Sequence, residues 1–301
     1  RMLAAGLLAL AGCATTAPQQ PNTIRPGARY VSLGSSYAAG AGIGALVPGT
    51  PQRCGRTENN YAHLLAERMQ LELIDSSCGG ATTAHILGTW NELPPQLDAV
   101  TPDTKLVTIT IGGNDLNFVR NLMVATCGRV PGMIPPAGRA CPSTAWPSEA
   151  DYSALGQRLR EIAREVRRRA PQAKLVFVDY VRILPDVGGC AALPLDERQM
   201  SAAREAFSRM AEITATSAAA EGATLVFLCV GNDNDLKEVT LGSEGAFHSV
   251  KKGAVFIDNT TASAKIAREL FIAAKEKGLL LNVADTPALC DFYLGSIVKK
   301  G

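Results

Sequence analysis

Three residues of this chain have chemistry suited to acyl transfer, and each lies beside a short apolar run. Ser36 follows the run Tyr30–Leu33, Asn114 follows Lys105–Ile111, and Gly80 lies in a turn of small residues between them. Loops that follow the strands of a parallel sheet converge at its carboxyl edge, where ligands bind. We therefore expect one edge to carry a hydroxyl nucleophile, a glycine N–H and a side-chain amide, the groups that attack an ester and stabilise its oxyanion.

The elements that must position these residues alternate between strand and helix patterns. The expected strands are 30–33, 71–75, 105–111, 174–178 and 224–230, and the expected helices are 60–69, 152–169 and 195–220. Such alternation predicts a three-layer α/β/α fold with a mostly parallel sheet. A Pro- and Gly-rich stretch, 119–150, is expected to be irregular.

Three sequence blocks resemble the SGNH (GDSL-type) hydrolases, a superfamily of esterases and lipases. The blocks are Tyr30-Val31-Ser32-Leu33-Gly34-Ser35-Ser36-Tyr37, Ser77-Cys78-Gly79-Gly80-Ala81-Thr82 and Gly112-Gly113-Asn114-Asp115. Cys54-Gly55-Arg56, Asn60-Tyr61 and the longer run Ser77–Thr83 also resemble a secreted actinobacterial-type branch of that superfamily. The resemblance covers about residues 28–225. It implies a flavodoxin-like sheet and hydrolysis of esters.

The resemblance also implies a role for each of the three residues. Ser36 matches the family's nucleophile, and Gly80 and Asn114 match its oxyanion-hole glycine and asparagine. One position departs from the family pattern, because Ser35 stands where the family usually has Asp. That Asp mainly braces the turn, so we expect the change to be tolerated.

The family's catalytic base is a His in an Asp-x-x-His motif near the C-terminus, and this chain contains no such motif. Of its three histidines, His63 and His85 precede Asn114 and only His248 follows it. The acid nearest upstream of His248 is Glu244, at the wrong spacing. His248 is thus the tentative base, and a surface His is the alternative.

The C-terminal part of the chain changes its resemblance. Residues 226–278 resemble the cofactor domain of β-hydroxyacid (3-hydroxyisobutyrate-type) dehydrogenases, and residues 279–301 resemble a siroheme synthase fragment. We expect an atypical C-terminal part and three units: a leader with tether at 1–27, a hydrolase-like domain at 28–225 and an α/β segment at 226–301. That segment could extend the same sheet or pack as an appended unit.

The N-terminal residues have the pattern of an export signal. Met2–Gly12 is a short apolar run, and Leu10-Ala11-Gly12-Cys13 resembles a bacterial lipobox in which Cys13 is lipidated. Thr15–Pro26 is Pro-rich and polar, as a tether would be. We expect a lipid-anchored protein of the bacterial cell envelope or the extracellular space.

The cysteine positions fit an oxidising compartment. Cys54 and Cys78 flank the loop between the nucleophile and oxyanion blocks, and Cys127 and Cys141 flank a Pro/Gly-rich excursion. Disulfides at both places would clamp long loops. We expect no metal site, because no Cys or His cluster has ligand spacing.

The sequence supports one functional class over two alternatives. We expect an ester hydrolase without a cofactor, acting on a small-molecule or lipid ester, with the effect of the missing Asp-x-x-His on its rate left open. One alternative is a non-catalytic lipoprotein that binds acylated or glycan ligands. The other is an NAD(P)-dependent dehydrogenase fragment. Such a protein needs a phosphate-binding glycine loop directly after a strand, and the candidate loop Gly40-Ala41-Gly42-Ile43-Gly44-Ala45 begins several residues after the strand pattern ends. A net charge of +2 does not favour nucleic acid as a partner.

Overall fold

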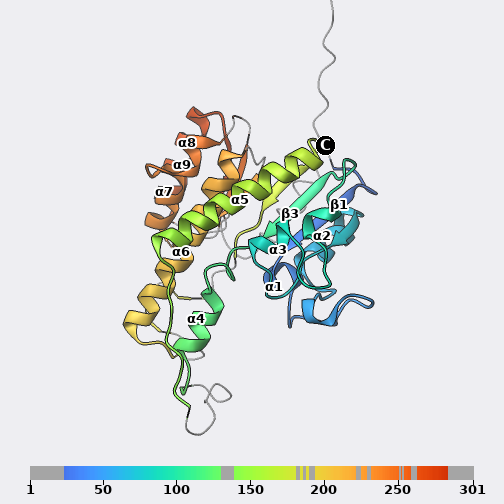
Figure 1. Ribbon diagram of the computed structural model, residues 1–301. Coiled ribbons are helices and arrows are strands. Elements are labelled where there is room, and N and C mark those ends of the chain that lie inside the picture. Colours follow the sequence, from blue (N-terminus) through green and yellow to red (C-terminus); the bar gives the residue numbers. More distant parts are fainter. Residues whose placement is uncertain are drawn as a thin grey trace, which may run out of the picture.

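The computed structural model describes residues 24–129, 139–180, 184–185, 188–189, 194–221, 225–228, 232–250, 252, 254–258 and 263–283. Within them the strands form one seven-stranded sheet in the order β2-β1-β3-β4-β5-β6-β7, and every neighbouring pair is parallel (Figure 1). The strands are β1 Arg29–Gly34, β2 Glu72–Asp75, β3 Leu106–Thr110, β4 Lys174–Phe177, β5 Leu225–Leu228, β6 Val255–Asp258 and β7 Leu280–Val283.

The helices follow the strands in the order that the alternation predicts. They are α1 Ser36–Ala39, α2 Tyr61–Met69, α3 Thr83–Leu87, α4 Phe118–Ala125, α5 Glu149–Arg169, α6 Glu197–Ala220, α7 Asp233–Leu241, α8 Ala246–Ser249 and α9 Ala264–Glu276, with short 3₁₀ helices η1 Gln52–Cys54 and η2 Gln96–Ala99. The sequence-based prediction of an α/β fold with a parallel sheet is confirmed.

Alternating strand residues bury the two faces of the sheet against different helices. On one face Tyr30 and Leu106 pack with Ala62 and Ala66 of α2. On the other face Val31, Leu33, Val107 and Ile109 join a core that includes residues of α5 and α6. The side-chain period of two along a strand explains this division, and the result is three layers.

Helix α5 shows how the sequence specifies one of these helices. Ser148 and Asp151 form a capping box at its start, in which each side chain bonds the backbone N–H of the other residue. Leu155, Leu159 and Ile162 are buried on one stripe, as an amphipathic helix requires. Three arginines, Arg167–Arg169, form its last turn, where positive charge interacts favourably with the helix dipole.

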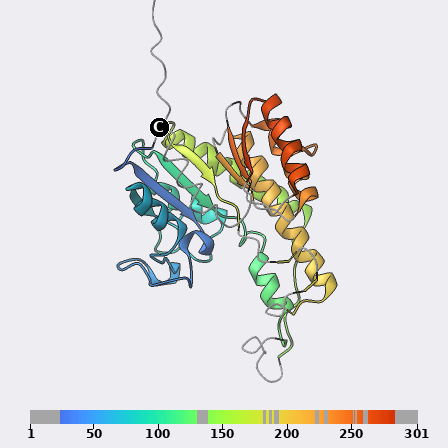
Figure 2. The same cartoon turned by 180° about the vertical axis from the view of Figure 1, so that it is seen from behind.

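The C-terminal segment extends the sheet, which settles the choice between the two arrangements considered from the sequence. β5 pairs with β4 through Val176–Leu225 and Phe177–Val226, and Phe256 and Leu270 belong to the same core as β1. Figures 1 and 2 show α7, α8 and α9 together at the end of the molecule away from α1 and α2. The proposed boundary between residues 225 and 226 falls inside β5 and stays a prediction.

One expectation about the stretch 119–150 is wrong. Helix α4, Phe118–Ala125, occupies its start, and Phe118 and Leu122 are buried there. Their spacing of four residues places them on one helix face, and burial of that face stabilises the helix despite the Pro- and Gly-rich sequence that follows. Residues 130–138 and residues 1–23, which include Cys13 and most of the predicted leader and tether, lie outside the described residues.

Candidate active site

The candidate site lies where the strand order changes direction. From β1 the chain adds β2 on one side of the sheet and then adds β3 and β4 on the other side. In the sheet β1 lies between β2 and β3. In doubly wound sheets such a switch point opens a crevice at the carboxyl ends of the strands. Ser36, at the end of β1, therefore lies between the loops that follow β2 and β3, as the sequence predicts.

A tight turn at Gly34 and Ser35 presents Ser36 at the start of α1. Gly34 has φ +144°, and a Cβ there would overlap the Thr110 carbonyl oxygen and lie 2.8 Å from the Ala38 Cβ. Only glycine fits this backbone and this space. Ser36 itself is half-buried at the carboxyl edge of the sheet.

Three distant segments hold the turn by hydrogen bonds to its backbone. The Gln96 side chain accepts from Gly34 N (2.7 Å) and donates to Gly34 O (3.0 Å). Ser35 N donates to Thr110 O (3.0 Å), and Cys78 N donates to Gly34 O (3.0 Å). The serine turn is thus fixed against β3 on one side and the β2 loop on the other.

The two predicted oxyanion loops are joined directly. Asn114 Nδ2 donates to Ala81 O over 2.8 Å. The neighbouring Asp115 carboxylate accepts from the backbone N–H of Thr83 (3.1 Å) and from its hydroxyl (2.5 Å). Gly80, just before Ala81, is exposed and has φ +82°. The structure therefore brings Gly80 and Asn114 to neighbouring loops at the edge that carries Ser36.

Tyr180, which the sequence analysis did not single out, connects the serine turn to the β3 loop. Its hydroxyl accepts from Gly113 N (3.0 Å) and lies 3.2 Å from the Ser35 hydroxyl. Its ring contacts Tyr37 edge-to-face with centroids 4.7 Å apart. Burial raises the pKa of Tyr180 well above its usual value, so the phenol stays neutral and can donate to Ser35.

Asp179 lies beside Tyr180 at the end of β4 and has an unusual environment. One carboxyl oxygen accepts from Tyr180 N (2.8 Å). The other is buried and has no hydrogen-bond partner within the described residues. Burial raises the pKa of Asp179 from its usual value to about 7, and the hydrogen bond from Tyr180 N opposes that rise.

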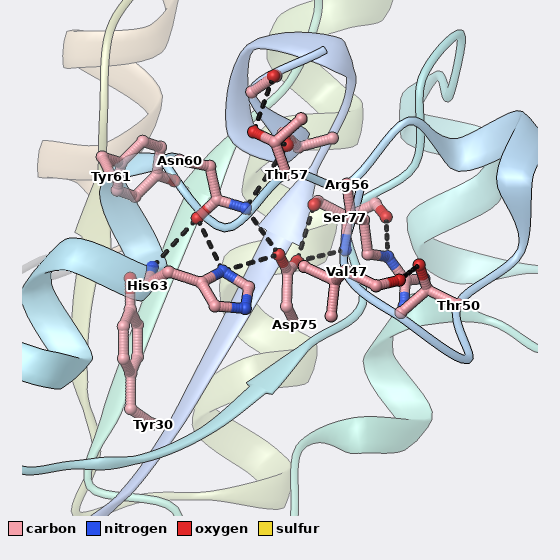
Figure 3. Close-up of polar contacts among 12 residues, drawn as sticks. Tyr30, Val47, Thr50, Arg56, Thr57, Asn60, Tyr61, His63, Asp75 and Ser77 are labelled. Atoms are coloured by element: carbon pink, nitrogen blue, oxygen red, sulfur yellow. Dashed lines mark hydrogen bonds and ion pairs between the residues drawn. The ribbon is translucent and has the colours of Figure 1, made fainter. Parts of the chain in front are cut away.

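A polar network on the other side of α1 supports the β2 loop (Figure 3). Asn60 Nδ2 donates to Asp75 (2.9 Å) and to Ala39 O (3.3 Å), which links the end of β2 to the end of α1. Asp75 also accepts from Ser77 N (3.0 Å) and the Ser77 hydroxyl (2.6 Å). His63 Nδ1 lies 3.0 Å from Asn60 Oδ1, so this histidine serves the network.

Both expected disulfides are present. One joins Cys54 to Cys78 and the other joins Cys127 to Cys141. The first bond ties η1 to the loop after β2, next to Gly79 N, which donates to Cys54 O over 2.8 Å. The cross-link therefore holds the segment that leads into Gly80.

His248, the tentative base, lies elsewhere. It belongs to α8, is exposed, and its Nε2 is 3.4 Å from Leu241 O. Helix α8 is at the end of the molecule away from α1 in both views (Figures 1 and 2). The structure does not bring His248 to Ser36, and its proposed role as base finds no support in the geometry.

Comparisons with known proteins agree with the fold and the site. The model of the GDSL-like Lipase/Acylhydrolase family matches residues 32–253. Lipase 2 of Streptomyces coelicolor is 33% identical over 243 residues, which cover 78% of this chain and 81% of that protein. The crystal structure of the extracellular lipase of Streptomyces rimosus aligns with a TM-score of 0.51 at 28% identity, covering 65% of this chain and 77% of that chain.

The parallel sheet, with Ser36 at its carboxyl edge, has the architecture of a hydrolase with an α/β fold. The extent of the matches to known proteins then identifies the family. The chain belongs to the GDSL family of lipases and acylhydrolases.

The dehydrogenase-like tail is also found by comparison, although only as a fragment. An uncharacterized oxidoreductase of Shewanella frigidimarina is 49% identical over 69 residues, which are 23% of this chain and 23% of that protein. So short a match carries no activity with it. Neither the dehydrogenase alternative nor the non-catalytic binding alternative gains support from the comparisons.

Proposed function

We propose that this chain hydrolyses carboxylic esters by acyl transfer to Ser36. Ser36 Oγ attacks the ester carbonyl, the alcohol leaves with a proton, and water then releases the acid from the acyl-enzyme. Gly80 N–H, Ser36 N–H and the Asn114 amide stabilise the oxyanion, with each donor contributing about 3 kcal/mol in the transition state. The observation that carries this proposal is the joining of the Asn114 and Ala81 loops at 2.8 Å beside the serine turn.

We further propose that turnover is slow relative to an enzyme with a complete triad. Within the described residues no side chain hydrogen-bonds Ser36 Oγ, so no positioned base accepts its proton. A serine without a base is a weak nucleophile. Oxyanion donors and substrate binding alone still retain about 10³–10⁴-fold acceleration over water.

Labelling with a fluorophosphonate probe, together with hydrolysis of a nitrophenyl ester, tests the proposal. Wild-type protein should be labelled, and Ser36→Ala should lose both the label and the hydrolysis. Ser35→Ala is the matched control, because it removes the adjacent hydroxyl and leaves Ser36 in place. Folded wild-type protein that takes no label and releases no nitrophenol would refute the proposal.

We propose that the protein works outside the cytoplasm and is anchored through Cys13. The two disulfides are typical of oxidising compartments, and a related Streptomyces rimosus lipase is described as extracellular. Within the described residues no helix combines the length and apolar character needed to cross a membrane. Expression in a bacterium that processes lipoproteins should place wild-type protein in the membrane fraction and Cys13→Ser outside it.

A further inference from the structure

A pocket lies between the end of β2 and the segment that leads to η2, and it borders the serine turn through Cys78 and Gln96. Its volume is ≈ 300 Å³. Its apolar wall includes Trp90, Leu93 and Pro94, and its polar wall includes Arg56, Ser76 and His85. Ser36, Gly80 and Asn114 are not among the residues that line it. Pockets with an apolar wall and a few convergent polar groups are typical ligand sites.

Arg56 supplies the charge of this pocket. Its Nε donates to Ser77 O over 2.6 Å, which fixes the guanidinium plane (Figure 3). Its two terminal nitrogens make no hydrogen bond within the described part of the chain. Burial lowers the pKa of Arg56 and Asp75 raises it, and an arginine remains charged at neutral pH. Arg56 also lines a neighbouring pocket with His63 and Asp75, and its four terminal N–H groups have no protein acceptor within the described residues.

Ser76 and His85 add two neutral donors. The Ser76 hydroxyl has no hydrogen-bond partner within the described residues, while its backbone N–H donates to Ser32 O. His85 Nδ1 accepts from Thr82 N over 3.0 Å, so the ring carries its proton on Nε2. Burial lowers the pKa of His85, helped by Arg53 and opposed by Asp115. At neutral pH His85 is therefore a neutral N–H donor.

The carboxylates close to the pocket already have partners. Asp98 lines it but pairs with Arg169 at 3.0 Å. Asp75 accepts from Ser77 and Asn60. The polar wall therefore offers hydrogen-bond donors from Arg56, Ser76 and His85, whereas its nearby carboxylates are already paired. Oxygen anions match such a set, because charge-assisted bonds to guanidinium are short and strong.

We propose that this pocket binds an anionic oxygen group, a carboxylate or a phosphate, held by Arg56, Ser76 and His85. The apolar part of such a ligand packs on Trp90, Leu93 and Pro94. The Trp90 ring also borders the oxyanion loop, since it lies 3.4 Å from where a Cβ on Gly80 would be. The site is assigned independently of catalysis at Ser36.

Fluorescence of Trp90 provides a direct readout. The chain has two tryptophans, and Trp146→Phe leaves Trp90 as the only one. Titration of that variant with inorganic phosphate and, separately, with hexanoate should change its fluorescence saturably with at least one of the two anions. The anion that binds identifies the group, phosphate or carboxylate. Absence of saturable change with both anions would overturn the proposal.

Variants then connect binding to the named side chains. In the Trp146→Phe background, Arg56→Gln should weaken binding about tenfold. Ser76→Ala, which removes a hydroxyl without a protein partner, should weaken it about threefold and leave the melting temperature unchanged. Arg158→Gln, the loss of an exposed arginine on α5, is the matched charge control and should change nothing. Equal affinity in wild type, Arg56→Gln and Ser76→Ala would also overturn the proposal, whether or not Ser36 proves to be catalytic.

Discussion

The β1–β3 region and the β5–β7 region continue one sheet and share one core, yet the polar contacts of their described residues differ in kind. In the β1–β3 region, loops distant in sequence are bonded to one another, as Gln96 is to Gly34 and Asn114 is to Ala81. Among the described residues of the β5–β7 region, polar contacts stabilise helix starts and helix surfaces. Asn232 caps α7, and Lys237 pairs with Glu269.

The difference shows what each part of a fold requires of its sequence. Extending a parallel sheet needs apolar strands of the right length with a helical crossover. A catalytic site instead needs single atoms in fixed positions. The β-α segment with the dehydrogenase-like sequence meets the first requirement, as the pairing of β5 with β4 and β6 shows. It does not bring His248 to Ser36.

Gly34→Ala, in the turn before Ser36, should lower the unfolding free energy more than any other variant considered. The new Cβ would overlap the Thr110 carbonyl oxygen at a φ of +144°, and we expect a loss of about 4 kcal/mol in unfolding free energy. Gly42→Ala is the matched control, since Gly42 has φ +87° but nothing within 4 Å; it should cost about 1 kcal/mol. Urea unfolding of both variants measures this, and equal losses would mean that packing at Gly34 does not matter.

Asn114→Ala tests the oxyanion half of the same region. Loss of the amide should lower kcat about 10²-fold, equivalent to about 3 kcal/mol. The lost bond to Ala81 should lower the unfolding free energy by about 1 kcal/mol. Steady-state kinetics with a nitrophenyl ester gives the rate, and Asn59→Ala, in an exposed loop, is the control. A change in KM alone would assign Asn114 to binding.

Asp179→Asn tests how a buried carboxyl at the end of β4, between the two regions, makes stability depend on pH. Burial raises the pKa of Asp179 to about 7, whereas an unfolded Asp titrates near ~4. Between these values the folded state binds more protons than the unfolded state. Its stability should therefore fall as pH rises from about 4 to 7 and stay reduced above. Asn cannot ionise, so the variant should gain on the order of 2 kcal/mol relative to wild type at pH 8 and little at pH 4.

Chemical unfolding at both pH values measures the Asp179 effect. Asp103→Asn, at an exposed carboxylate, supplies the control. An equal gain at both pH values would contradict the assignment of that pH dependence to Asp179.

His248→Ala should change activity and stability least. It tests directly whether the β5–β7 region contributes to catalysis. His248 is exposed, and the one described hydrogen bond of its side chain, to Leu241 O, is 3.4 Å long. We expect kcat/KM for ester hydrolysis and the melting temperature to be unchanged. A tenfold fall in kcat/KM with the fold intact would show that His248 does reach Ser36 during turnover.

Much of the serine edge could be predicted from the sequence because its signals are local. Ser36, Gly80 and Asn114 each follow or adjoin a strand pattern, and the parallel order of the strands then brings their loops to one edge. The cysteine pairs were predictable for a similar reason, since each pair flanks one loop.

The supporting contacts could not be predicted, because they join residues far apart in the chain. Gln96 is 62 residues from Gly34, and Tyr180 is 145 residues from Ser35. Nothing near either residue in the sequence indicates its partner. The order of residues along the chain also favoured His248, but order does not determine which end of the sheet a helix occupies.

The bond between Cys54 and Cys78 has a practical consequence for preparing the protein. The segment that leads to Gly80 is tethered at Cys78, and both cysteines are buried in the main core, so chain that folds without this bond would hold the oxyanion loop less firmly. Specific activity of recombinant material should then follow its oxidation state more closely than its circular dichroism. Material refolded with a glutathione redox couple should outperform material purified from a reducing cytosol.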